Sequence, residues 1–282
     1  MTSVLVAALA LATLAGAAAP PQQHTATRSR GVDVVLGEPL AAAHAHNDYE
    51  HERPLFDALE QGFTSVEVDV WLIGGELLVA HSLEGVRPGV TLESLYLDPL
   101  DEMVKGRSVY PGWNGSVQLL IDIKSEPETT YAAIEAALAE RSGIMTRYSD
   151  GKTKRGAVTA VVSGNRPLAT MRAQTNRFSF YDGRSGDLAG DIPATLMPLV
   201  SENWTRLFTW NGEGAMPEAE RAKLHEYVQT AHNKGYRVRF WATTDVAGAA
   251  RDAVWTQLYE AGVDHINTDD LVGLRAFLSA RS

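Results

Sequence analysis

Cysteine is absent from the 282-residue sequence, which excludes disulfide bonds, thiolate metal sites and thiol nucleophiles. Any bound metal must therefore be held by carboxylates and imidazoles. Basic residues are also few, because 25 lysines and arginines stand against 35 aspartates and glutamates, and they form no long run. With a formal charge of −10, the protein is a poor candidate for binding nucleic acid, and we expect no such partner.

Long apolar runs are limited to the first 19 residues, so the sequence predicts no transmembrane segment. Residues 1–19 are too short to span a bilayer comfortably and end in an Ala-Xaa-Ala pattern before Pro20, although their first residues include no lysine or arginine. We interpret this segment as the signal peptide of a secreted, extracellular protein. Residues 20–37 are polar and poorly patterned, which indicates a disordered or extended leader.

Residues 38–282 are expected to form a single domain, because 45% of the chain is apolar and supports one sizeable core. We also expect the protein to be a monomer. Three stretches repeat the order of amphipathic helix, glycine and β-rich run, with glycines at Gly62, Gly235 and Gly262. Glycine suits the left-handed residue that commonly follows a helix. Helix feeding strand, repeated along the chain, is typical of a parallel α/β fold.

Eight candidate strands complete this pattern, and eight is the number that closes a (β/α)₈ barrel, or TIM barrel. Residues 75–82 form a further extended piece after the second strand. The candidate strands lie at about 40–46, 65–71, 117–123, 157–163, 177–181, 195–200, 237–241 and 265–267. The predicted fold class is therefore α/β, with a single TIM-barrel domain.

In such barrels the active site lies at the C-terminal ends of the strands, where this sequence has many polar residues. The second candidate strand contains Glu67 and Asp69, and the third leads into Asp122 and Lys124. Residues two apart on a strand share a face, so each pair can point into the barrel. Three converging carboxylates would repel one another and be costly to bury, and a divalent cation resolves both problems. Mg²⁺ is the first candidate, Ca²⁺ the alternative, and Mn²⁺ is also compatible.

Two histidines complete the set of candidate catalytic residues. His46 follows the first candidate strand, and His81 lies in the extended piece after the second. Imidazole titrates near neutrality, so one histidine can act on the attacking group while the other protonates the leaving oxygen. Lys124 beside a cation is suited to bind a phosphate and to stabilise charge on its oxygens.

The chain resembles the phospholipase-C-like phosphodiesterase superfamily in residues 44–72, 77–82 and 119–126. This superfamily includes glycerophosphodiester phosphodiesterases and the phospholipase D toxins of spiders. Within this superfamily, the chain resembles the family named after altered inheritance of mitochondria protein 6 from about residue 40 to the end. Residues 92–100 and 239–245 belong to that resemblance. It implies that residues 38–282 form a phosphodiesterase-like barrel.

The resemblance also implies roles for individual residues. His46 and His81 take the places of the two catalytic histidines. Lys124 corresponds to a lysine near the phosphate, and Trp241 to an aromatic residue that lines the pocket. The family's metal-ligand positions fall on Glu67, Asp69 and Asp122. In glycerophosphodiester phosphodiesterases the first motif usually reads His-Arg-Gly and the third strand carries glutamate, whereas this chain has His-Asn-Asp at 46–48 and Asp122.

Further residues near the strand ends are expected to border the substrate pocket. His44 shares a strand face with His46 and is either a pocket residue or a packed structural histidine. The aromatic residues at 204, 208 and 210 form either a substrate platform or part of the core. The residues assigned to the pocket are Asn47, Asp48, Ser163, Asn165, Trp241 and Asn267, with Asp269 a further residue at its edge.

We therefore expect a metal-dependent phosphoric diester hydrolase with two-histidine acid/base catalysis. Its substrate would be a glycerophosphodiester or phospholipid-like compound, either a small molecule or a lipid headgroup, and its product a hydrolysed or a cyclic phosphate. One alternative is an amidohydrolase-like metal hydrolase, because His44-Ala-His46 resembles the opening metal motif of that family. Such enzymes usually take further histidines from the fifth and sixth strands, and the fifth and sixth candidate strands of this sequence contain none. The other is a non-catalytic exported binding protein with a structural cation.

Overall fold

The computed structural model describes residues 34–104 and 108–281. The predicted signal peptide at 1–19, and the leader up to residue 33, lie outside the described residues. In the part that is described, no helix combines the length and apolar character needed to cross a membrane.

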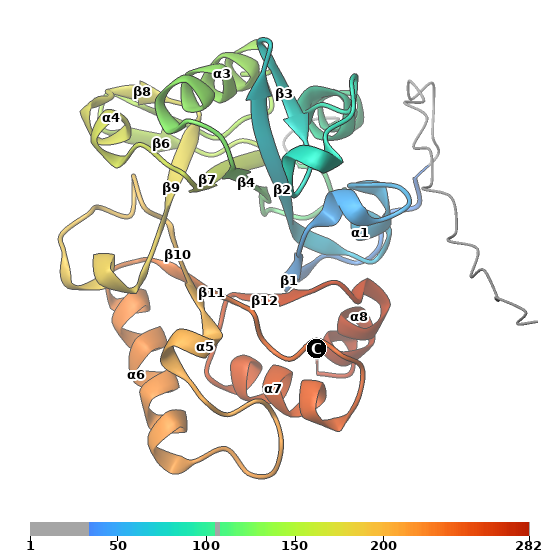
Figure 1. The fold of residues 1–282 in the computed structure, drawn as a ribbon, viewed down its shortest axis with the longest axis vertical. Helices are drawn as coiled ribbons and strands as arrows, with labels where there is room; N and C mark the ends of the chain where they lie inside the picture. Colours follow the sequence, from blue (N-terminus) through green and yellow to red (C-terminus); the bar gives the residue numbers. More distant parts are fainter. Residues whose placement is uncertain (1–33, 105–107, 282) are drawn as a thin grey trace, which may run out of the picture.

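Eight parallel strands close into a barrel at the centre of the molecule, as predicted (Figure 1). Each strand pairs with the next one around the barrel, and β1 closes the ring by pairing with both β2 and β12. The barrel strands are β1 (Leu40–Ala45), β2 (Phe63–Ile73), β4 (Val117–Ile123), β7 (Val158–Gly164), β9 (Ser179–Gly183), β10 (Leu199–Asn203), β11 (Arg237–Trp241) and β12 (His265–Thr268).

Helices surround this barrel, with α3 and α4 on one side and α6, α7 and α8 on the opposite side (Figure 1). The α-helices are α1 (Phe56–Glu60), α2 (Asp98–Met103), α3 (Pro127–Glu140), α4 (Leu168–Ala173), α5 (Trp204–Leu207), α6 (Glu218–Asn233), α7 (Ala249–Glu260) and α8 (Leu271–Ser279). The described residues also include three 3₁₀ helices, η1 (Asp48–Glu50), η2 (Leu83–Gly85) and η4 (Ser185–Ala189), and the π-helix η3 (Glu93–Leu97).

In residues 34–104 and 108–281, four additional strands lie outside the barrel. The predicted extended piece after the second strand is β3 (Glu76–Val79), which pairs antiparallel with β2. The others form a small antiparallel sheet of β5 (Arg147–Ser149), β6 (Lys152–Lys154) and β8 (Asn176–Arg177).

The three glycines of the repeated helix-to-strand pattern have the backbone conformation that the sequence predicted. Gly62, Gly235 and Gly262 have φ values of 83°, 79° and 80°. At Gly62 a Cβ atom would also come within 2.0 Å of the Glu38 carbonyl oxygen. Glycine is therefore required there both for its positive φ and for close backbone packing.

Two barrel strands begin at least two residues later than predicted. The fifth barrel strand begins at Ser179 instead of residue 177, because Asn176–Arg177 pairs with β5 in the small sheet. The sixth begins at Leu199 instead of residue 195. Here the Leu196 amide donates to the Pro193 carbonyl in a turn, so the apolar run starts before the strand does.

Alternation along the strands divides side chains between two environments. On β2, Val66, Val68 and Val70 join the main core between barrel and helices, while Glu67 and Asp69 point into the barrel. One part of the interior is apolar and contains Leu120, Val161, Phe180 and Leu199. Another part is polar and buried, and it contains His44, Ser65, Gln118, Arg239 and His265.

Candidate active site

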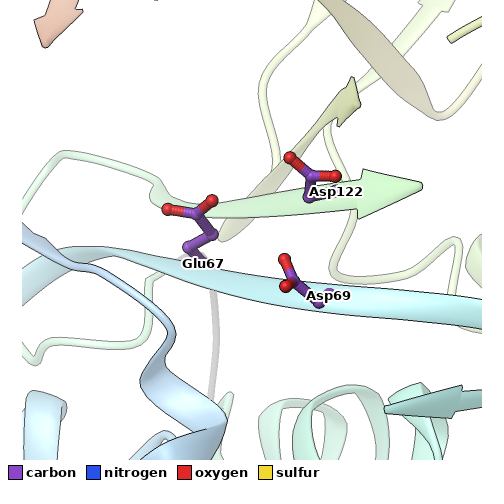
Figure 2. A group of neighbouring side chains, drawn as sticks. All are labelled: Glu67, Asp69 and Asp122. Carbon is purple, nitrogen blue, oxygen red and sulfur yellow. The ribbon is translucent and has the colours of Figure 1, made fainter. Parts of the chain in front are cut away.

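Three carboxylates meet near the C-terminal ends of β2 and β4. The parallel register pairs Asp69 with Asp122, and Glu67 lies two residues earlier on the same face of β2. One oxygen from each residue lies within 4.8 Å of the others. Figure 2 shows the three side chains extending from the same side of these two strands. The structure thus brings together all three predicted metal ligands.

Each carboxylate keeps an oxygen available for a cation. The buried Oδ1 of Asp69 has no hydrogen-bond partner among the described residues. The hydrogen bonds and ion pairs described for Glu67 reach Oε2, from Arg239 and His44, and the ion pair described for Asp122 reaches Oδ1. Because an unpaired buried carboxylate oxygen is costly, this donor set fits a divalent ion with oxygen ligands.

Burial raises the pKa of both aspartates, and that of Asp122 reaches about 6. The Lys124 ammonium opposes this effect, while the neighbouring carboxylates add to it. Burial also acts to raise the pKa of Glu67, but the Arg239 guanidinium and the hydrogen bond from His44 outweigh it and lower the pKa. Glu67 is therefore stabilised as an anion by the protein, whereas the two aspartates need more positive charge than the protein supplies.

Lys124 lies between the two aspartates, with its Nζ 3.1 Å from Asp69 Oδ2 and 3.1 Å from Asp122 Oδ1. Burial acts to lower the pKa of this lysine, but the two carboxylates outweigh it and raise the pKa. Tyr49 also donates to Asp69 Oδ2, at 2.8 Å. Lys124 thus faces the carboxylate cluster, as the sequence predicted.

His46 follows β1 and is oriented by Asp269, which follows β12. Its Nδ1 lies 2.8 Å from Asp269 Oδ1, and a carboxylate can only accept, so Nδ1 carries the proton. Burial acts to lower the pKa of His46, but the hydrogen bond to Asp269 and the charge of Glu67 outweigh it and raise the pKa. In the neutral form of the ring, this tautomer leaves Nε2 without a proton and therefore able to act as a base.

His81 reaches the same cluster from the segment after β3. Its Nδ1 donates to Asp69 Oδ2 at 3.0 Å, and 66% of its side chain is exposed. The antiparallel β2–β3 pairing folds the chain back along β2 and brings His81 close to Asp69. The second predicted catalytic histidine therefore contacts the carboxylate cluster from its solvent side.

His44 is fully buried beneath the cluster. Its Nδ1 lies 2.7 Å from Ser65 Oγ, and its Nε2 lies 3.3 Å from Glu67 Oε2. Burial, aided by Arg239, lowers its pKa to about 4, so the ring is neutral at pH 7. Both nitrogens are engaged, which makes His44 a packed residue that orients Glu67.

The residues after His46 have different surroundings. Asn47 adopts a left-handed conformation and its Oδ1 lies 3.1 Å from the Tyr49 hydroxyl, which places it near Asp69. Asp48 turns away, because its buried carboxylate accepts from the Leu55 amide at 2.6 Å and the Tyr96 hydroxyl at 2.8 Å. The pocket assignment of Asp48 is therefore corrected to a loop-anchoring role.

The other predicted pocket residues lie at different depths. Ser163 is buried and donates to Asp182, and Asn267 is buried and accepts from Arg239. Asn165 is exposed at the rim, where its amide donates to the backbone carbonyls of Lys124 and Ser125. Ser163 and Asn267 therefore support neighbouring side chains, and only Asn165 is open to solvent.

Trp241 is half-buried, and two arginines lie over its ring. The Cζ atoms of Arg184 and Arg239 are 5.0 and 6.0 Å from its centroid. Arg184 also pairs with Asp182 at 2.6 Å, and it is close enough to be affected by the charge of Asp122. Sequence reasoning did not identify either arginine, although Arg239 shares a strand face with Trp241 and could have been found by alternation.

The aromatic residues after the sixth strand form part of the core. Trp204, Phe208 and Trp210 are each at most 7% exposed. Trp204 and Phe208 stack with centroids 4.1 Å apart, and both pack against Phe240. Of the two interpretations offered by the sequence, core packing is the observed one.

Comparison with known proteins agrees with this geometry. Residues 37–182 match the AIM6-like phosphodiesterase domain, and residues 237–271 match the glycerophosphoryl diester phosphodiesterase family. Altered inheritance of mitochondria protein 6 from Eremothecium gossypii is 30% identical over 290 residues, covering 92% of this chain and 73% of the relative. The chain belongs to the altered inheritance of mitochondria protein 6 family.

Other relatives extend the comparison. A homolog of altered inheritance of mitochondria protein 6 from Arthroderma benhamiae is 26% identical over 271 residues, covering 87% of this chain and 86% of the relative. Two solved structures from Parabacteroides distasonis share the fold with TM-scores of 0.50. One, titled a glycerophosphodiester phosphodiesterase, is 15% identical and covers 87% of this chain and 99% of that one. The other, titled a glycerophosphoryl diester phosphodiesterase, is 12% identical and covers 88% and 89%. This member of the altered inheritance of mitochondria protein 6 family therefore has a phosphodiesterase fold.

Proposed function

We propose that this protein is a metal-dependent phosphoric diester hydrolase. The observation that carries the proposal is the meeting of three carboxylates within 4.8 Å, beside a lysine and two histidines that are fixed through their Nδ1 atoms. Membership of a family described as phosphodiesterase-like supports the reaction class.

Glu67, Asp69 and Asp122 would hold the metal ion, with Mg²⁺ first and Ca²⁺ as the alternative. A bound divalent ion would stabilise the negative charge that develops on the phosphate oxygens. The three carboxylates of Glu67, Asp69 and Asp122 are paired with only two cationic side chains, Lys124 and Arg239, which leaves one negative charge unbalanced. A divalent ion would turn this surplus into one positive charge, which suits an anionic phosphodiester.

In the proposed mechanism, the chain's own residues bind the phosphate and move two protons. Lys124, with Arg184 nearby, provides positive charge for the phosphate. The unprotonated Nε2 of His46 accepts the proton of the attacking hydroxyl as its oxygen bonds to phosphorus. His81 donates a proton from Nε2 to the alcohol oxygen as the bond from phosphorus to that oxygen breaks. Attack by water gives a hydrolysed product, and attack by a neighbouring substrate hydroxyl gives a cyclic phosphate.

A glycerophosphodiester or the headgroup of a phospholipid-like molecule is the proposed substrate. Trp241 offers an aromatic surface, and the adjacent Arg184 offers positive charge. Turnover of lysophospholipids, glycerophosphodiesters and sphingomyelin, followed by phosphorus NMR, would identify the flanking alcohol and the form of the product. We also propose that residues 1–19 direct export, which amino-terminal sequencing of the mature protein would test.

The reaction class is tested with a chromogenic phosphodiester such as bis(p-nitrophenyl) phosphate. We expect turnover with Mg²⁺ or Ca²⁺, loss of turnover in EDTA, and recovery when the metal is restored. His46→Ala and His81→Ala should each reduce kcat by at least roughly 10²-fold. His225→Ala, which changes an exposed histidine on α6, is the matched control and should leave kcat unchanged.

The binding-protein alternative predicts a different result in the same experiment. If every phosphodiester in the panel stayed intact while one of them bound in a metal-dependent manner, the protein would be a binder and the catalytic proposal would fail. The amidohydrolase-like alternative has no support from the structure, because both nitrogens of His44 are engaged by Ser65 and Glu67.

A further inference from the structure

A pocket opens at the opposite end of the barrel from the carboxylates. Its volume is about 390 Å³, within the size range of small-molecule sites. It lies where β1, β2, β11 and β12 begin, and these strands are neighbours in the barrel (Figure 1). Its lining includes Trp113, Arg237, Tyr259, Val263, Asp264 and His265.

Arg237 brings a positive charge into this pocket, where the charge of Asp264 acts on it without forming an ion pair. Its Nη1 donates to His265 Nε2 at 3.0 Å, and its Nη2 donates to Gln118 Oε1 at 2.7 Å. Both acceptors are neutral, and in the described part of the chain Arg237 forms no ion pair. A guanidinium has five N–H donors, so three of them are left for a ligand.

His265 adds another unsatisfied donor. It is 3% exposed, and burial lowers its pKa well below the ordinary value, so the ring is neutral. Because Nε2 accepts from Arg237, the proton resides on Nδ1. This buried Nδ1 has no hydrogen-bond partner among the described residues. The two side chains together offer several donors and no free acceptor, which favours an anionic ligand.

The remaining lining restricts the charge and shape of that anion. Asp264 also lines the pocket, and its Oδ2 accepts from His232 and from the Val238 amide, both at 2.8 Å. Its negative charge disfavours a doubly charged ligand such as phosphate more than a singly charged one. Trp113 and Val263 add apolar wall, so the pocket suits an anion with an apolar body.

The structure assigns this pocket, we propose, to a monocarboxylate with an aromatic or short aliphatic body, whose carboxylate pairs with Arg237. A planar guanidinium fork matches a single carboxylate in geometry. The body of the ligand would lie against Trp113 and the ring of Tyr259. This site lies at the other end of the barrel from the carboxylate cluster, and ligand binding there does not depend on the proposed reaction.

Benzoate and hexanoate are suitable probes, with benzamide as the neutral analogue of benzoate and inorganic phosphate as the dianion. Saturation-transfer NMR and isothermal titration calorimetry on the full chain should give a dissociation constant of about 1 mM or lower for benzoate. Benzamide and phosphate should bind at least about tenfold more weakly. Equal binding of benzamide, or preferential binding of phosphate, would overturn the assignment.

Variants locate the binding. Arg237→Met keeps the apolar stem and removes the charge, and it should weaken benzoate binding at least about tenfold. Arg206→Met, which changes an exposed arginine on α5, is the matched control and should bind as the wild type does. If Arg237→Met does not fold, Trp113→Ala tests the site instead. This variant leaves the guanidinium in place and should weaken benzoate binding by several fold. Unchanged affinity in the folded variant tested, or no benzoate binding by the wild type, would refute the site.

Discussion

Asp269→Asn is the most informative change in the proposed active site. The carboxylate of Asp269 accepts from His46 Nδ1 at 2.8 Å, and this hydrogen bond is what leaves Nε2 free to accept a proton. An amide at the same position can donate from its nitrogen to Nδ1. The imidazole would then carry its proton on Nε2, where it cannot act as a base.

The expected loss of activity follows from the strength and exposure of this hydrogen bond. Hydrogen bonds to charged groups contribute about 1.5–3 kcal/mol, which corresponds to roughly 10- to 150-fold in rate. The Asp269 side chain is 66% exposed, so solvent screens its charge. We therefore expect kcat to fall by roughly 10- to 100-fold, less than the loss of about 10⁴-fold seen for a buried triad aspartate.

The pH profile provides a second readout. As a base, His46 works in its neutral form, so kcat should rise as pH increases through the pKa of His46. Burial opposes the rise in this pKa, but the hydrogen bond to Asp269 is the strongest of the interactions that produce it. Removing the carboxylate should lower the pKa and move the acidic limb of the profile to lower pH.

Steady-state kinetics on a chromogenic phosphodiester at saturating Mg²⁺, from pH 5 to 9, would measure both effects. Asp101→Asn, which changes an exposed aspartate on α2, is the control and should leave kcat and the profile unchanged. A kcat for Asp269→Asn within twofold of the wild type, with an unmoved acidic limb, would refute the assigned role of His46 as the oriented base.

Three further changes test the ligands and their support. Glu67→Gln should abolish measurable Mg²⁺ or Ca²⁺ uptake in calorimetry and lower kcat at least as strongly as loss of a catalytic histidine, because it removes an anionic ligand. Gly164→Ala should weaken metal binding and destabilise the fold by at least about 1 kcal/mol in denaturant unfolding, since φ is 66° and a Cβ atom would lie 2.2 Å from Asp122 Oδ1. Gly143→Ala, where a Cβ atom meets nothing within 4 Å, should do neither. Asp48→Asn should gain stability relative to the wild type as pH rises from 4 to 7, by up to about 3 kcal/mol, because burial raises the pKa of Asp48 to about 6 and ionisation of the wild-type carboxyl then costs folding free energy. Denaturant unfolding that gives the same free-energy difference between variant and wild type at both pH values would contradict this.

The sequence was sufficient to predict the fold and the carboxylate cluster because both depend on simple periodicities. Alternation on β2 and β4 placed Glu67, Asp69 and Asp122 on inward faces, and the strand order brought them together. The boundary of β10 could not be predicted, because the apolar run that includes Leu196 continues through a turn before the strand begins. Apolar character alone does not distinguish a buried turn from a buried strand.

The contacts that the sequence did not predict are chiefly those between side chains from distant parts of the chain. Arg239 pairs with Glu67 across 172 positions, and no local pattern in the sequence indicates this contact. Asp48 was assigned to the pocket because it follows His46, but a turn directs its carboxylate to Tyr96, which is 48 positions away. Proximity in sequence to a catalytic residue therefore indicates where the backbone lies, and it does not determine where a side chain points.

The buried polar residues beneath the site explain why its three carboxylates differ. Arg237 donates to Gln118, whose amide donates to Ser65 Oγ at 2.8 Å. Ser65 must then donate to Nδ1 of the neutral His44, whose Nε2–H donates to Glu67. Arginine can only donate and a carboxylate can only accept, so each hydrogen bond in this series, from Arg237 to Glu67, has its donor on the Arg237 side. Glu67 is thus held as an anion by the barrel itself, whereas Asp69 and Asp122 have no such support from below, and a cation bound at the cluster would chiefly neutralise these two.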